Sequence, residues 1–111
     1  MPATHDDAVL MVELAKWGAM IDLGGAARAI FADDFDVEGA QASEPAVQTV
    51  LQFYETLGTL VKNGLLNREL VLDWVWVAGA WSRVGPAAKR ARERASLPAL
   101  YENFEALAAS G

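Results

Sequence analysis

Apolar residues along this chain recur at intervals of three and four, the spacing that places side chains on one face of an α-helix. The first segment with this spacing carries Leu10, Leu14, Trp17 and Ile21. The clearest segment, over residues 46–63, has apolar residues on one side and Gln, Glu, Thr and Lys on the other. No segment of useful length alternates between apolar and polar residues, so the pattern predicts an all-α protein.

Turn and capping residues divide this pattern into separate helices. A glycine pair at 24–25 breaks the first segment, Pro45 opens the clearest one, Asn67 caps the next, and a Gly-Pro pair at 85–86 ends it. We therefore predict a compact, bundle-like single domain over residues 1–111, with five to six helices. Their predicted ranges are 6–21, 26–32, 46–63, 68–84, 86–95 and 97–109.

Three of the four tryptophans lie within residues 71–81, VLDWVWVAGAW. On one continuous helix over 68–84, Trp74 and Trp81 share an apolar arc about 200° wide, and core packing accounts for both. Trp76 falls at the edge of the polar stripe, close to Arg83. A large aromatic side chain in that position often marks a contact surface, although a neighbouring element covering it is the alternative.

The composition narrows the possible functions. Apolar residues make up 53% of the chain, which argues against disorder, and the formal net charge of −6 argues against nucleic acid as the main partner. The absence of cysteine excludes disulfides and zinc–thiolate sites and fits a cytoplasmic location. The start of the chain lacks the features of a signal peptide, and no window is long and apolar enough for a transmembrane helix.

The acidic loop over residues 33–44 partly matches the pattern of a calcium-binding loop. Four of its residues fit the first half of an EF-hand: Asp34, Asp36, Glu38 and Gly39. However, Pro45 stands where the bidentate glutamate is required. We therefore expect a solvated loop with helix-capping acids, with weak divalent-cation binding as the alternative.

No catalytic, metal-binding or cofactor-binding set emerges from the sequence. His5 is the only histidine and has no partner at metal-ligand spacing. No phosphate-binding loop, dinucleotide fingerprint or nucleophile motif is present. We therefore predict a protein that is not an enzyme and has no cofactor.

The segment from Arg83 to Arg94 carries five of the nine basic residues. Its small alanine stripe indicates that this helix packs on the body of the protein. We expect its charged side chains to form a solvated face, with a docking surface for an acidic partner as the alternative.

The stretch FYETLGTLVKNGLLN (53–67) resembles an uncharacterised family of small bacterial and phage-associated helical proteins, classed as a domain of unknown function. The matching residues are Phe53, Tyr54, Glu55, Gly58, Leu60, Val61, Gly64, Leu65 and Leu66. Later features of the pattern are Trp81, a basic helix with Arg90 or Arg92, and YENFEAL at 101–107. The resemblance covers residues 46–108 and implies an all-α fold, but no reaction or catalytic residues.

We predict a helical interaction protein, acting as a subunit, adaptor or inhibitor. It would bind a protein partner or a second copy of itself through the surface of helix 68–84. The predicted contact residues are Trp76, Leu72, Gly79 and Arg83. One alternative is a small apolar ligand-binding domain whose pocket is lined by Trp17, Tyr54, Trp74 and Phe104. Another is a peripheral subunit of a membrane complex.

Overall fold

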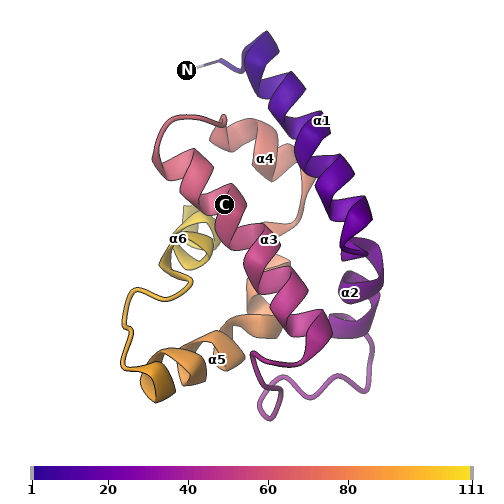
Figure 1. Ribbon diagram of the computed structural model, residues 1–111, viewed down its shortest axis with the longest axis vertical. Helices are drawn as coiled ribbons and strands as arrows, with labels where there is room; N and C mark the ends of the chain where they lie inside the picture. Colours follow the sequence, from indigo (N-terminus) through magenta and orange to yellow (C-terminus); the bar gives the residue numbers. More distant parts are fainter. Residues whose placement is uncertain (1, 111) are drawn as a thin grey trace.

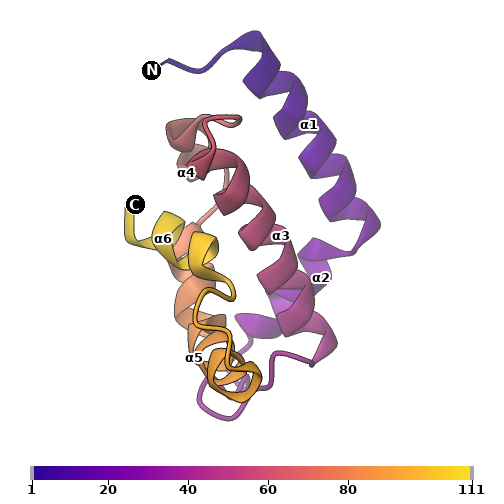
Figure 2. The same cartoon turned by 60° about the vertical axis from the view of Figure 1, so that its left-hand side comes forward.

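A computed structural model of the chain describes residues 2–110, and its elements are shown in Figures 1 and 2. The described residues form six helices: α1 (His5–Met20), α2 (Leu23–Ile30), α3 (Pro45–Lys62), α4 (Arg68–Trp74), α5 (Val77–Ala95) and α6 (Glu102–Ser110). They contain no strand, so the predicted all-α fold is confirmed. None of these helices combines the length and the hydropathy needed to cross a bilayer.

Helix α3 is at the centre of the packing. It contacts α2, α5 and α6, while α1 lies along one edge of the molecule next to α2 (Figures 1 and 2). Most of its apolar face is buried, as the amphipathic pattern predicts, and Tyr54 and Val61 on this face are partly buried. The buried residues of this face include Val47, Val50, Leu51, Phe53 and Leu57. Side chains from the other helices join this face in one hydrophobic core.

Two residues of α3 hold α6 against it. A Cβ atom built on Gly58 would lie 2.3 Å from the backbone oxygen of Asn103, so only glycine permits this close approach. One turn earlier, Oε1 of Glu55 accepts a hydrogen bond of 2.9 Å from the backbone N–H of Phe104, near the start of α6. Both residues belong to the sequence stretch that resembles a known family.

The prediction of one continuous helix over 68–84 is wrong. Helix α4 ends at Trp74, Val75 is extended (φ −133°, ψ 148°), and α5 begins at Val77. The run of β-branched and aromatic residues from 74 to 77 has low helix propensity, so a break costs little there. The break also allows Val71 and Val77, on either side of it, to be fully buried.

The predicted helix boundary at Gly85-Pro86 is also wrong, because α5 continues through both residues to Ala95. Pro86 cannot donate a hydrogen bond to the preceding turn. Burial on both sides compensates for that loss, since Val84 and Ala87 are completely inaccessible to solvent.

The ends of the four other predicted helices also shift. Helix α2 begins at Leu23, because Asp22 accepts a hydrogen bond from the backbone N–H of Gly25, so the glycine pair lies inside the helix. Helix α6 begins at Glu102 instead of residue 97, after Tyr101 in a left-handed conformation (φ 60°). The helices predicted over 6–21 and 46–63 are present with ends shifted by one residue.

Candidate aromatic interaction site

Trp76 lies on the surface at the junction between α4 and α5. It is 70% exposed, and its indole stacks on the ring of Phe31, which is itself 42% exposed. The ring centroids are 5.8 Å apart and the ring planes are inclined by only 6°. We call these two residues the aromatic patch. It joins the end of α2 to the start of α5.

Gly79 lies beneath the indole ring of Trp76, on its protein side. A Cβ atom built on this residue would lie 2.2 Å from Cδ2 of Trp76, so the indole lies directly over the glycine backbone. Gly79 is buried and presents no side chain to solvent. Gly79 is one of the predicted contact residues, and the structure places it beneath the indole of Trp76.

Arg83 also supports the patch from within the protein. Its Nε donates a 2.6 Å hydrogen bond to the carbonyl of Ile30, and its Nη2 donates a 3.1 Å bond to the carbonyl of Ala32. These carbonyls flank Phe31, and the guanidinium also lies 5.3 Å from the ring centroid of Phe35. Arg83 therefore caps the end of α2 and fixes the backbone that carries Phe31.

The predicted contact residues thus have different places in the structure. Trp76 is exposed, Gly79 lies beneath it, Arg83 holds α2, and Leu72 packs partly buried against the core. Only Trp76 of this set presents a large exposed side chain. Phe31, which shares the surface with it, was not among the predicted contact residues.

The family model for DUF4760, a domain of unknown function, matches residues 14–110. The chain belongs to this family. No curated protein and no solved structure matches it significantly. The match includes α2 to α6 and therefore both members of the aromatic patch.

The arginines of α5 in this DUF4760 domain bind the protein's own chain. The guanidinium of Arg90 donates to the backbone carbonyl of Ala40 in the acidic loop, and Arg94 Nη2 donates to Gln41 Oε1 at 2.7 Å. Arg92 Nε donates to the carbonyl of Leu100 at 2.6 Å. The predicted solvated face is therefore wrong for Arg90 and Arg92, which are partly buried, whereas Arg94 is exposed. They hold the loop before α3 and the segment before α6 against the body.

Arg92 makes an additional contact that fixes α6. Its Nη1 forms a 2.8 Å ion pair with Glu105 Oε1, and its guanidinium lies 5.8 Å from the ring centroid of Trp81. The Arg92 side chain is only 15% exposed, so this pair is shielded from water more than a surface ion pair is. The basic helix of the DUF4760 domain thus has a structural role in joining α5 to α6.

The acids of the loop over 33–44 stabilise turns in the DUF4760 domain. Asp36 Oδ1 accepts a hydrogen bond from the backbone N–H of Gly39, and Glu44 Oε2 accepts one from that of Gln41. Asp33 and Asp34 are exposed and lie two and three residues after Phe31. Within residues 2–110, no three His, Asp or Glu side chains lie close enough together to hold a metal ion.

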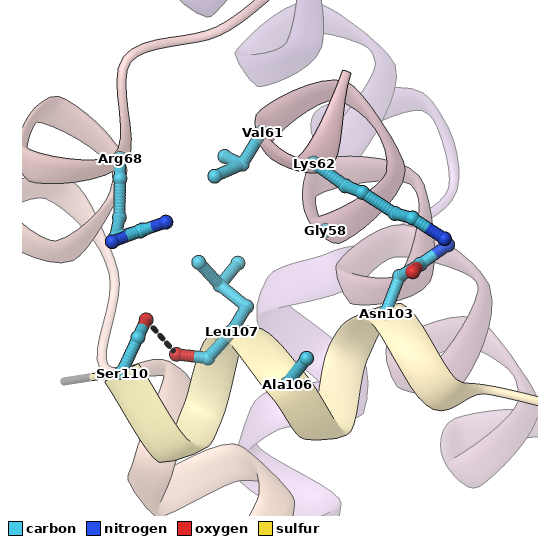
Figure 3. Close-up of a pocket in the computed structure, with 8 residues that line it drawn as sticks. All are labelled: Gly58, Val61, Lys62, Arg68, Asn103, Ala106, Leu107 and Ser110. Carbon is cyan, nitrogen blue, oxygen red and sulfur yellow. Dashed lines mark hydrogen bonds between the residues drawn. The ribbon is translucent and has the colours of Figure 1, made fainter. Parts of the chain in front are cut away.

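The aromatic residues that the ligand-pocket alternative placed around a pocket pack against one another. Trp17 and Trp74 both contact Phe53, with ring centroids at 5.2 Å and 6.2 Å. Tyr54 stacks on Phe104 at 5.0 Å, and burial raises the pKa of its phenol. These rings form part of the core of the DUF4760 domain and do not line the cavity shown in Figure 3, which lies between α3, α4 and α6.

Proposed function

We propose that this protein is a non-enzymatic binding module that docks a basic protein partner through the aromatic patch. The observation that carries the proposal is the position of Trp76, which is 70% exposed and yet held by Phe31 and Gly79. Tryptophan is enriched among the few residues that dominate binding energy in protein interfaces. An exposed indole in a fixed position fits that role.

The rigidity of the patch supports this proposal. Binding usually requires side chains at the interface to lose rotamer freedom, at a cost of about 0.5–1.5 kcal/mol for each flexible side chain. Stacking on Phe31 and the close contact with Gly79 already restrict the indole in the free protein. Much of the ordering cost for Trp76 therefore arises on folding and not on binding.

The charge distribution favours a basic partner over a second copy of the chain. The formal net charge is −6, and the four arginines of α5 donate hydrogen bonds to residues outside that helix. The exposed carboxyl groups of Asp33 and Asp34 lie two and three residues after Phe31. Two such surfaces repel each other, whereas a partner with lysine or arginine around an apolar contact complements them.

The proposal is tested with immobilised wild-type protein and a Trp76→Ala variant. The matched control is Leu65→Ala, which truncates another large exposed side chain, located in the turn between α3 and α4. We expect wild type and the control to retain the same basic protein from the native host. We expect Trp76→Ala to weaken its affinity about 30-fold or more, measured by titration calorimetry with the purified partner.

Two results would overturn the proposal. One is a partner that binds Trp76→Ala as tightly as wild type. The other is a dimer of the wild-type chain, detected by light scattering, that dissociates in the Trp76→Ala variant, because a second copy would then occupy the patch. The salt dependence gives a further readout, since binding to a basic partner should weaken as the ionic strength rises.

A further inference from the structure

A half-open cavity of about 260 Å³ lies between α3, α4 and α6, at a place distinct from the aromatic patch. Gly58, where α3 comes close to the backbone of α6, is one of the residues that line it (Figure 3). Its volume is near the lower end of the range for small-molecule sites. The cavity combines an apolar wall with charged groups at its rim.

Arg68 supplies the charge that faces into this cavity. Its guanidinium extends into the space between Val61 and Leu107 (Figure 3). Among residues 2–110, no carboxyl group lies within ion-pairing distance of Arg68. Lys62 extends in a different direction, toward Asn103, and its ammonium lies 4.0 Å from Glu102 Oε1. Of the two cations that line the cavity, the guanidinium is thus the one without a carboxylate partner among residues 2–110.

The neutral polar groups at the cavity already have partners. The hydroxyl of Ser110 donates a 2.8 Å hydrogen bond to the carbonyl of Leu107, as the dashed line in Figure 3 shows. Nδ2 of Asn103 donates a 3.1 Å bond to Thr59 Oγ1. A ligand in the cavity therefore meets Arg68 at one end and mainly hydrocarbon elsewhere.

The apolar lining of the cavity indicates that the rest of the ligand is hydrocarbon. Val61 and Leu107 flank the guanidinium, and Ala106 extends the apolar wall along α6 (Figure 3). A planar guanidinium matches a carboxylate through two parallel hydrogen bonds. A phosphate dianion fits less well, because it would meet one free cation and several methyl groups.

We infer that this cavity binds a small monocarboxylate with a short aliphatic chain, its carboxylate paired with Arg68 and its chain against Val61 and Leu107. The site is separate from the proposed partner surface, so it adds a small-molecule ligand to that function. The inference does not depend on the proposed partner. A Trp76→Ala variant should bind the carboxylate as wild type does.

The test is a titration of the isotope-labelled protein with hexanoate, followed by amide NMR. We expect saturable shifts at Val61, Arg68 and Leu107, with stronger binding than for butyrate. Arg68→Gln should weaken the affinity for hexanoate about tenfold or more. The matched control is Arg28→Gln, which removes an exposed arginine on α2 and should leave the affinity unchanged.

A second variant tests the location independently of charge. Ala106→Phe fills the cavity from an exposed position on α6, so it should fold normally and abolish the hexanoate shifts. Hexanol and inorganic phosphate are the chemical controls. The inference is overturned by equal binding of hexanol, by the same shifts with phosphate, or by unchanged affinity in Arg68→Gln. It is also overturned if no carboxylate gives saturable shifts up to about 10 mM.

Discussion

Substituting Gly79 by alanine separates the geometry of the aromatic patch from the stability of the fold. The added Cβ atom would lie 2.2–2.5 Å from three atoms of the Trp76 indole, so the ring must leave its position over α5. Because Trp76 is exposed, the ring can move outward without disturbing the core. The stacking contact with Phe31, at 5.8 Å between centroids, should then be lost.

The expected change in stability follows from two opposing effects. Because 70% of Trp76 is exposed, its covered part corresponds to about 70 Å² of mainly apolar area, or about 2 kcal/mol at 25 cal/mol per Å². Alanine recovers up to about 1 kcal/mol of helix propensity relative to glycine. The free energy of unfolding should therefore fall by only about 1 kcal/mol in Gly79→Ala.

Two measurements check this prediction. Urea unfolding followed by circular dichroism gives the free energy of unfolding, and NMR contacts between the Trp76 and Phe31 rings report the stacking. The control is Gly24→Ala, where the added Cβ atom would be at an ordinary 3.7 Å from Arg28. A loss of more than about 3 kcal/mol would show that Gly79 acts as a core residue. Retained ring contacts would show that the indole does not depend on it.

Three further predictions concern the scaffold. Arg83→Met removes both hydrogen bonds to the carbonyls at the end of α2, so the free energy of unfolding should fall by about 2 kcal/mol in a urea titration. Gly58→Ala places a Cβ atom 2.3 Å from the backbone oxygen of Asn103, so it should cost about 2 kcal/mol or more and broaden the NMR signals of α6. Hydrogen bonding, mainly to the backbone N–H of Thr4, lowers the pKa of Asp7 below its usual 3.8. The ionised carboxylate therefore contributes stability above pH 3.8 that is lost as the pH falls through the lowered pKa, and Asp7→Asn should reduce that acid dependence of unfolding.

The helices were predictable where local spacing determines burial. For α3, the apolar spacing predicts a helix and Pro45 predicts where it starts. The structure confirms both predictions. The break at Val75 was not predictable in the same way, because residues 68–84 keep a helical pattern of apolar residues across it. At Pro86 the prediction failed in the opposite direction, because a helix end was expected there and α5 continues. Its local tendency to end a helix is overcome by the burial of the residues around it, which depends on α3 and α6.

Of the candidate site, the sequence singled out only Trp76, and it did so from a continuous helix over 68–84 that the structure does not contain, with exposure and coverage both open. Its contact with Phe31 joins residues that no local pattern connects. The bonds from Arg83 to α2 are equally non-local, and a charged residue near a polar stripe is normally expected in solvent. Sequence periodicity describes one helix at a time, whereas this site forms where two helices meet.

The bonds from Arg83 to the backbone on both sides of Phe31 have a consequence for how a partner would select this protein. The two rings lie side by side only when α2 and α5 are docked, so an unfolded or proteolytically cut chain does not present the pair. A partner that contacts both rings would discriminate native from damaged molecules. Because it would bind only the folded chain, it would also raise the apparent free energy of unfolding as the partner's concentration rises. The increase is about 2.7 kcal/mol when the partner is at 100 times its dissociation constant.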